Sequence, residues 1–343
     1  MKASWHKHRL DFRFTAITSR DSLTFKDTYY IKVWDEQSPE MTGIGEAGLF
    51  RGLSYDDRPD YESLLTRVCS DIDMYTASTD GLAEYPSIRF GVETALRDLA
   101  GGGVHRLFDT PWSNGRGAIT INGLIWMGDR ETMRSRIETK LAEGFGCIKV
   151  KIGGIDFGQE LELLAYLRSL APDIEIRIDA NGAFRPDEAL GRLDRLAKIG
   201  IHSIEQPVRQ GQWDEMARIC ADSPIAIALD EELIGINDND TRRRMLDSVK
   251  PDYIILKPTL TGGFEASDAW ITLAAERGIG WWATSALESN IGLNAIAQWV
   301  SAHDTIIPQG LGTGQLYQNN IASPLVLSGD RLRYDTEKDW GKI

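Results

Sequence analysis

Five short segments decide the fold: CIKVKI at residues 147–152, EIRIDA at 175–180, HSIEQ at 202–206, IAIALD at 225–230 and YIILKP at 253–258. Each is a β-rich run with charged residues near its end, and a stretch with helical periodicity follows it. Such a pair takes roughly 25 to 30 residues, which is typical of βα units in a parallel sheet. The sequence therefore predicts an α/β fold whose strand ends place their charges on one rim.

The same alternation continues on both sides of these segments. It predicts further strands at 118–125, 281–285 and 305–310, with seven helical stretches between the eight strands. Eight short strands at regular spacing favour a closed barrel over an open sheet. An open doubly wound sheet more often carries a glycine-rich phosphate turn after its first strand, and Asn122-Gly-Leu-Ile is not such a turn.

The N-terminal third has a different pattern. Runs at 12–17, 28–34 and 43–50 predict a small β-meander, and apolar spacing over 60–73 and 87–99 predicts two helices. The glycines at 101–103 should end the second helix. We expect an α+β domain over residues 1–110 and a barrel over 111–322, with the tail, 323–343, completing the N-terminal domain.

Composition bounds the class of protein. The 343 residues are 42% hydrophobic and carry a net charge of −13, which suits a globular core and opposes binding to nucleic acid or to anionic membranes. The three cysteines form no CxxC pair, so neither a disulfide framework nor a zinc site is expected. With no apolar signal segment at the N-terminus, these features predict a cytoplasmic protein.

The charged strand ends form one candidate site. Lysines come first and last in the series and carboxylates lie between them: Lys149, Lys151, Asp179, Glu205, Asp230 and Lys257. Carboxylates about 4 Å apart repel by about 4 kcal/mol at an effective dielectric of about 20, so a cation is expected among them. Oxygen ligands without histidine favour Mg²⁺, or Mn²⁺. A structural ion-pair network is the alternative, although five successive strand ends favour an active site.

A metal between lysines indicates proton abstraction next to a carboxylate. The metal would bind the substrate carboxylate and stabilise the charge that develops as the α-proton leaves. Lys151 is the expected base, because Lys149 and a divalent cation beside it disfavour its ammonium form. Lys257 would face the substrate from the opposite side.

These residues resemble the enolase superfamily, and in particular its muconate-lactonizing subgroup. The resemblance rests on the Lys149-Val-Lys151 motif, the three carboxylates and the partner lysine, and it covers nearly the whole chain. It implies an N-terminal α+β capping domain on a (β/α)7β modified TIM barrel. It also implies a set of functional residues: Lys149, Lys151 and Lys257 in catalysis, with Mg²⁺ held by Asp179, Glu205 and Asp230.

Within the subgroup, the segments LKPTLTGG at 256–263, TSALESNIGL at 284–293 and GLGTG at 310–314 are similar to the o-succinylbenzoate synthases. The resemblance implies dehydration of 2-succinyl-6-hydroxy-2,4-cyclohexadiene-1-carboxylate to o-succinylbenzoate, a step of menaquinone biosynthesis. Lys151 would then remove the α-proton and protonate the leaving hydroxyl, while Lys257 steadies the enediolate.

Three alternatives stay open. An N-acylamino acid racemase of the same subgroup would also need two lysines flanking one carbon. Dipeptide epimerases typically carry Asp-x-Asp after the eighth strand, where this chain reads Gly310-Leu-Gly-Thr-Gly. A non-catalytic barrel with a structural metal is more remote.

Selection of the substrate, by the same resemblance, belongs to capping-domain loops at about 18–24 and 49–55. Arg20 and Arg51 lie there and are candidate partners for a second carboxylate, which a guanidinium can bind in bidentate fashion. Ser285 and the backbone at Gly312 are further candidates for lining the pocket. The expected partner is a small-molecule carboxylate.

Overall fold

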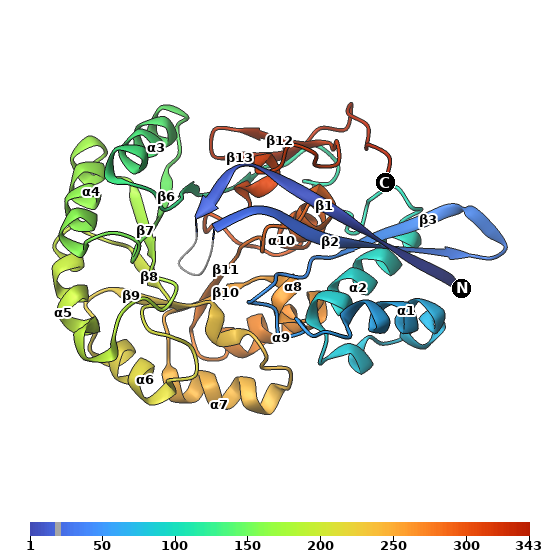
Figure 1. The fold of residues 1–343 in the computed structure, drawn as a ribbon, viewed down its shortest axis with the longest axis horizontal. Coiled ribbons are helices and arrows are strands. Elements are labelled where there is room, and N and C mark those ends of the chain that lie inside the picture. Colours follow the sequence, from blue (N-terminus) through green and yellow to red (C-terminus); the bar gives the residue numbers. More distant parts are fainter. Residues whose placement is uncertain (18–21) are drawn as a thin grey trace.

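A parallel sheet forms the centre of the molecule in the computed structural model, which describes residues 1–17 and 22–343 (Figure 1). Its strands follow each other in chain order, so every strand lies beside the one before it. They are β5 (Gly123–Ile125), β6 (Cys147–Lys151), β7 (Glu175–Asp179), β8 (Ser203–Glu205), β9 (Ala226–Leu229), β10 (Tyr253–Leu256) and β11 (Gly280–Ala283).

Helices connect these strands and cover the outside of the curled sheet (Figure 1). Apolar side chains such as Ile148, Val150 and Ile178 are fully buried within the main core, which also holds Leu164 and Leu193 of the covering helices. The helices are α3 (Arg130–Ala142), α4 (Phe157–Leu170), α5 (Pro186–Ala197), α6 (Trp213–Asp222), α7 (Asn239–Val249), α8 (Pro258–Thr261), α9 (Gly263–Ala275) and α10 (Asn290–Ser301).

The eighth barrel strand, predicted at 305–310, is not a strand. Single parallel bridges replace it: Gln309 pairs with Ile121, and Gly310 pairs with Thr284 of the chain after β11. Pro308 has no N–H to donate and Gly310 has no side chain to pack, so this segment cannot hold a longer ladder. The two bridges nevertheless connect both edges of the sheet and confirm the predicted closed arrangement.

The first predicted barrel strand, 118–125, is divided in two. Only β5 joins the barrel, whereas β4 (Ile119–Thr120) pairs antiparallel with β13 (Arg331–Tyr334) of the tail. β12 (Leu325–Ser328) completes this small sheet. The tail therefore divides its contacts: its hairpin extends β4, while the last residue, Ile343, accepts a hydrogen bond from Lys32 Nζ at 2.7 Å.

The N-terminal unit is an antiparallel sheet with two helices. Its strands are longer than predicted: β1 (Lys2–Ile17), β2 (Ser22–Asp35) and β3 (Ser38–Ala47). The predicted helices are α1 (Tyr61–Ser70) and α2 (Pro86–Ala100). α2 approaches β3 so closely that a Cβ atom on Gly45 would stand 1.9 Å from the Gly91 carbonyl oxygen, so only glycine fits there.

Single-turn 3₁₀ helices occupy some of the connections. They are η1 (Ile72–Tyr75), η2 (Asp80–Leu82), η3 (Glu231–Leu233) and η4 (Gly312–Gln315). Asp230 alone separates the end of β9 from the start of η3, and η4 turns the chain next to the barrel mouth.

The N-terminal unit reaches over the barrel through β1 and β2 (Figure 1). Phe12 of β1 forms an antiparallel bridge with Tyr317, and Lys26 of β2 donates to the Leu287 carbonyl at 3.0 Å. Glu46 of β3 accepts hydrogen bonds from the backbone N–H groups of Ser289 and Gly292, both at 2.9 Å, and so caps α10 from another part of the molecule. These contacts hold β1 and β2 against the mouth of the barrel.

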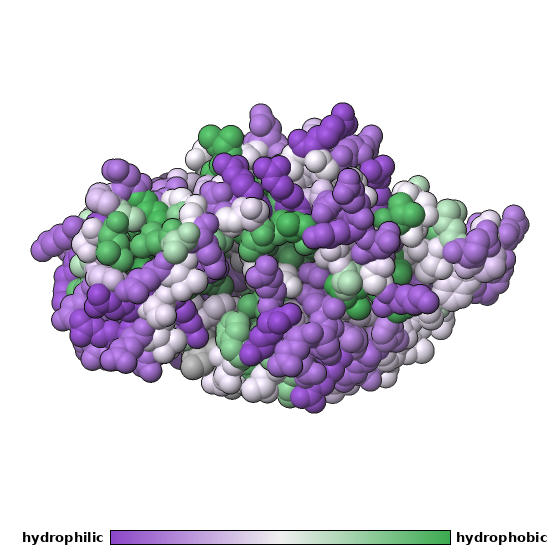
Figure 2. Space-filling view, turned by 90° about the horizontal axis from the view of Figure 1, so that it is seen from above, coloured by the Kyte–Doolittle hydropathy of each residue, from purple (hydrophilic) through white to green (hydrophobic). Residues whose placement is uncertain are grey.

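The surface is mostly hydrophilic on the face seen from above, and its apolar areas form separate patches (Figure 2). None of the helices in residues 1–17 and 22–343 is long and apolar enough to cross a membrane. Most of the large apolar side chains lie inside instead. Trp282, for example, is buried in the barrel with the Arg177 guanidinium 4.2 Å from its ring centroid.

Candidate active site

The ends of neighbouring strands bring the predicted site residues into one arc. Lys151 pairs in register with Asp179, and Asp179 pairs with Glu205. Asp230 directly follows β9 and Lys257 directly follows β10, so the arc continues over the next two strands. The parallel register thus produces the charged rim that the spacing predicts.

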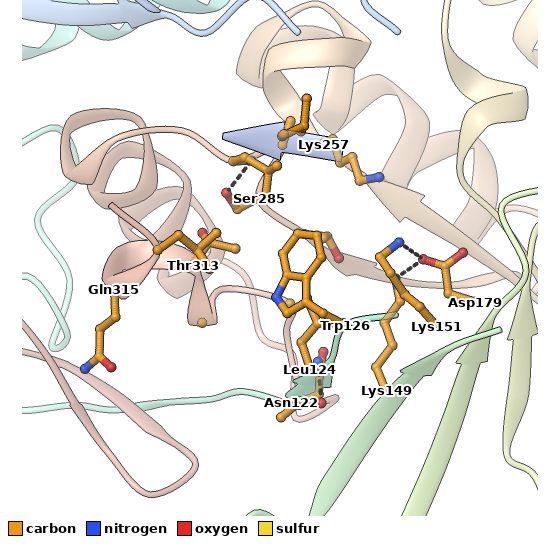
Figure 3. A pocket seen from close by; sticks show the side chains of 18 of the residues that line it. Asn122, Leu124, Trp126, Lys149, Lys151, Asp179, Lys257, Ser285, Thr313 and Gln315 are labelled. Atoms are coloured by element: carbon orange, nitrogen blue, oxygen red, sulfur yellow. Dashed lines mark hydrogen bonds and ion pairs between the residues drawn. The ribbon is translucent and has the colours of Figure 1, made fainter. Parts of the chain in front are cut away.

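Ion pairs connect the lysines and carboxylates of this arc. Lys149 Nζ lies 2.6 Å from Glu205 Oε2 and 3.0 Å from Asp179 Oδ2. Lys151 Nζ lies 2.9 Å from the same Asp179 oxygen (Figure 3) and 2.8 Å from Asn181 Oδ1. Lys257 is paired with Asp230. Four of the six predicted residues are therefore joined by ion pairs, and Lys257 with Asp230 forms a second pair whose charges act on Glu205.

Buried charges in this cluster fix each other's protonation. Burial alone would lower the pKa of Lys149, but the nearby carboxylates, Asp179 and Glu205 foremost, outweigh burial and raise it. Burial alone would raise the pKa of Asp179, but Lys149 and Lys151 outweigh burial and hold it well below its ordinary value. Lys149 is therefore an ammonium and Asp179 a carboxylate at neutral pH.

Glu205 has the properties of a carboxylate that accepts a cation. Burial, followed by the negative charge of Asp179, raises the pKa of Glu205 to about 8. Its Oε1 atom is buried and has no hydrogen-bond partner among the described residues. A buried oxygen without a donor is costly unless a ligand or ion satisfies it.

The donor set of Asp179, Glu205 and Asp230 fits Mg²⁺ or Mn²⁺ in its chemistry, because these ions prefer oxygen ligands. In residues 1–17 and 22–343, however, no three His, Cys, Asp or Glu side chains already stand close enough to hold a metal ion. Lysine ammonium groups are bound to the oxygens of these three carboxylates instead. The donor chemistry and the unpartnered Glu205 oxygen fit a divalent cation, which competes with lysine for the same oxygens.

A cavity of about 620 Å³ opens over the cluster. Lys149, Lys151, Asp179 and Lys257 lie along one side of it in the close view, and Thr313 and Gln315 lie along the other (Figure 3). Glu205 and Asp230 are not among the residues that line the cavity, and they reach it through the lysines they bind. The cavity thus exposes amines to a substrate and keeps two of the carboxylates behind them.

Of the residues predicted to bind substrate, three line this cavity: Arg51, Ser285 and Gly312. Arg51 is already held by Asp57, whose Oδ1 lies 2.5 Å from its Nη1. Ser285 Oγ donates to the buried Glu288 carboxylate. Arg20 lies outside the described residues.

Several lining residues were missed by sequence reasoning. Trp126 directly follows β5 and points into the cavity beside Lys151 (Figure 3). The rule that found the charged strand ends could have found it too, because the predicted first strand ends at residue 125. Glu231, which accepts from Asn181 Nδ2 at 3.1 Å, also lines the cavity. Phe14 lines it from β1, and no spacing along the chain signals that contact.

Comparison with known proteins identifies the family of the chain. The family described as enolase C-terminal domain-like matches residues 132–336. The chain is 47% identical over 368 residues to the o-succinylbenzoate synthase of Desulfotalea psychrophila, covering 97% of this chain and 98% of that protein. The crystal structure of MenC from that organism has a TM-score of 0.83 and 45% identity, covering 97% of this chain and 99% of that one.

A muconate lactonizing enzyme from Pseudomonas fluorescens, complexed with muconolactone, shares the fold. Its TM-score is 0.82 at 21% identity, and the match covers 99% of this chain and 94% of that chain. At that identity the likeness is one of fold alone. The family match spans more than half of the sequence and the synthase match nearly all of it, so the chain belongs to the enolase superfamily, in its enolase C-terminal domain-like family.

Proposed function

We propose that this chain dehydrates 2-succinyl-6-hydroxy-2,4-cyclohexadiene-1-carboxylate to o-succinylbenzoate. One observation carries the proposal: the 47% identity to an o-succinylbenzoate synthase extends over 97% of this chain and 98% of that protein. The cavity suits the reaction, because its lysines face a space large enough for a small dicarboxylate. The reaction would belong to menaquinone biosynthesis.

We propose Asp179, Glu205 and Asp230 as the ligands of Mg²⁺. When bound, the ion would supply positive charge to the substrate carboxylate, where negative charge develops as the α-proton leaves. Lys149 is buried against Asp179 and Glu205, so its role is to hold these two side chains close together.

Lys151 is the base in this proposal. It lines the cavity, and only Asp179 and Asn181 hold its ammonium among the described residues. A base must be a neutral amine, and Lys151 presents its amine to the cavity from the end of β6. Lys151 takes the α-proton and then delivers it to the leaving hydroxyl, so that water departs and the ring becomes aromatic.

Lys257 lines the cavity from another strand and is held there by Asp230. In the proposed reaction it remains an ammonium, because Asp230 and Glu205 outweigh burial and raise its pKa. A fixed positive charge on this side stabilises the negative charge on the substrate after the proton has left.

An N-acylamino acid racemase is the second candidate. Two lysines on one cavity also serve a 1,1-proton transfer, in which one removes a proton and the other returns it. A dipeptide epimerase has less support, because a substrate ammonium needs a carboxylate, and the lining residues from 310 to 316 carry none.

The test is the rate of o-succinylbenzoate formation by purified protein with Mg²⁺ and again with excess EDTA. Fast turnover that EDTA abolishes and added Mg²⁺ restores supports the proposal. A protein that binds Mg²⁺ and turns over only N-acylamino acids, measured by exchange of the α-proton with solvent deuterium, refutes it in favour of the racemase.

We place this reaction in the cytoplasm. Cys69, Cys147 and Cys220 are free thiols, two of them buried, and thiols of this kind persist in a reducing compartment.

A further inference from the structure

Among the charged side chains that line the cavity, the cationic ones outnumber the acidic ones. Its acidic lining residues are Asp179 and Glu231. The basic ones are Arg51, Arg136, Lys140, Lys149, Lys151 and Lys257. A chain with a net charge of −13 therefore presents a positive interior to its ligand, which favours a ligand with more than one negative charge.

All but one of these cations already have a carboxylate partner. Lys149, Lys151 and Lys257 are paired within the strand-end cluster. Arg51 is paired with Asp57, and Lys140 with Glu143. Arg136 of α3 makes no ion pair within residues 1–17 and 22–343.

Two backbone carbonyls hold the Arg136 guanidinium at the cavity. Its Nη1 donates to the carbonyl oxygens of Trp126 at 2.9 Å and Met127 at 3.0 Å, and its Nε and Nη2 atoms make no hydrogen bond within the described part of the chain. Burial lowers the pKa of Arg136, and the more distant Asp129 opposes that effect. Arg136 remains charged in any case, because a guanidinium does not lose its proton in this range. The result is a fixed, partly buried cation with free donors.

Trp126 connects this cation to the reacting end. Its side chain points into the cavity beside Lys151, while its carbonyl oxygen is held by Arg136 (Figure 3). The Phe14 ring lies 6.0 Å from both the Trp126 ring and the Arg136 guanidinium carbon. An aromatic surface thus leads from the base to the unpaired cation.

We propose that Arg136 binds the second carboxylate of the substrate, the one at the far end of its succinyl chain. This inference rests on the proposed function, which supplies a dicarboxylate with one carboxylate at the reacting carbon. The free Nε and Nη2 atoms can bind that second carboxylate in bidentate fashion. Arg51, which the sequence suggested for this role, is 54% exposed and is occupied by Asp57.

The experiment measures the binding of two ligands to the Mg²⁺-loaded protein by calorimetry. One ligand is o-succinylbenzoate, and the other is 2-butanoylbenzoate, which has the same skeleton but ends in a methyl group. Arg136→Met should weaken o-succinylbenzoate binding about 10- to 100-fold, the loss expected for a charge-assisted pair. It should change 2-butanoylbenzoate binding by less than about twofold, since that ligand has nothing for the guanidinium to bind.

Arg134→Met is the matched control. Arg134 lies on the same helix, but it is exposed, pairs with Glu138 and does not line the cavity. This variant should bind both ligands like the parent.

Arg136→Lys keeps the charge but not the bidentate geometry, so it should fall between the parent and Arg136→Met. It also serves as the test should Arg136→Met fail to fold.

Three outcomes would overturn the inference. An equal loss for both ligands would mean that Arg136 only supports the Trp126 loop. No loss for either ligand would mean that the second carboxylate binds elsewhere. A selective loss in Arg51→Met but not in Arg136→Met would assign the carboxylate to Arg51. A parent protein that turns over the cyclohexadiene carboxylate would, in each case, leave the proposed function standing.

Discussion

The cavity has two walls that differ in how their charged groups are paired. The strand-end wall consists of Lys149, Lys151, Asp179 and Lys257, whose charges are buried or partly buried and paired with one another or with the carboxylates behind them. The loop wall consists of residues from loops, from β1 and from α3: Phe14, Phe50, Leu53, Trp126, Arg136, Ser285 and Gly310. It is largely apolar, and its Arg136 guanidinium has no carboxylate partner among residues 1–17 and 22–343. Chemistry and selection are therefore built from different parts of the fold.

Lys151→Ala tests the strand-end wall most severely. Loss of the base should lower the rate about 10²- to 10⁴-fold, because a positioned proton acceptor contributes that much. The measurement is o-succinylbenzoate formation, together with exchange of the α-proton with solvent deuterium. Lys198→Ala, an exposed lysine at the end of α5, should keep the parent rate. Exchange that persists in Lys151→Ala would move the base to Lys257.

Glu205→Gln tests whether the carboxylates behind this wall bind metal. The substitution replaces the carboxylate whose Oε1 atom has no hydrogen-bond partner among the described residues. It should weaken Mg²⁺ or Mn²⁺ binding by at least about 100-fold. Residues that only support metal ligands typically account for a loss of about 10- to 100-fold. Calorimetric titration of the protein with each ion measures this. Glu188→Gln on the surface of α5 is the control. Unchanged affinity in Glu205→Gln would show that the ligands are wrongly assigned.

Asp56→Asn tests the support of the loop wall. Asp56 is buried and accepts from Ser87 N at 3.0 Å and from Ser87 Oγ at 2.6 Å, which anchors the loop that carries Phe50 and Leu53. Burial raises the pKa of Asp56 from 3.8 to about 6, although the Ser87 hydrogen bonds lower it. Between these two pH values, Asp56 is protonated in the folded protein and ionised in the unfolded chain. The folded protein therefore loses stability as the pH rises from the lower value to the higher one.

The parent should lose about 2 kcal/mol of unfolding free energy, relative to Asp56→Asn, between pH 4 and pH 7. Urea denaturation of both proteins at the two pH values measures this difference. Asp60→Asn alters an exposed neighbour and should give a difference near zero. If the unfolding free energies of the parent and of Asp56→Asn changed equally between the two pH values, the titration would be wrongly assigned to Asp56.

Gly310→Ala and Gly312→Ala probe the glycine turn of the loop wall. A Cβ atom on Gly310 would stand 2.4 Å from Thr284 Oγ1, whereas on Gly312 the nearest atom, Ile121 Cδ1, would be 3.4 Å away. Gly310→Ala should cost about 1–3 kcal/mol of stability, and Gly312→Ala less than about 0.5 kcal/mol. Thermal unfolding measures both. Equal losses would mean that the turn adapts as a whole and that the contact with Thr284 is unimportant.

Sequence reasoning succeeded where strand register alone places a residue. Lys151, Asp179 and Glu205 lie in one row because parallel strands of similar length put equivalent positions at the same height. Their regular spacing along the chain therefore carried spatial information. The assignment of these residues as base and metal ligands stays a prediction, since register places side chains and does not show what they bind.

Sequence reasoning failed where contacts between distant parts of the chain determine the structure. The segment 305–310 is rich enough in β-branched residues to suggest a strand, but Pro308 and Gly310 limit it to single bridges. Ile119 and Thr120 leave the barrel to pair with the tail, a contact more than 200 residues away in sequence that no local pattern signals. Arg136 was missed because it lies on a covering helix, whereas the search followed strand ends.

Glu46 of β3 links the N-terminal sheet to the barrel, so the two cannot be separated without exposing its partners. The first turn of α10 donates its backbone N–H groups to a carboxylate that belongs to the N-terminal sheet. A barrel produced without that sheet would leave these donors, and the adjacent Ser289 hydroxyl, without their acceptor in an apolar setting. We therefore expect the two halves to unfold together, and exchange of the sheet between relatives to require transfer of this carboxylate together with the helix that it caps.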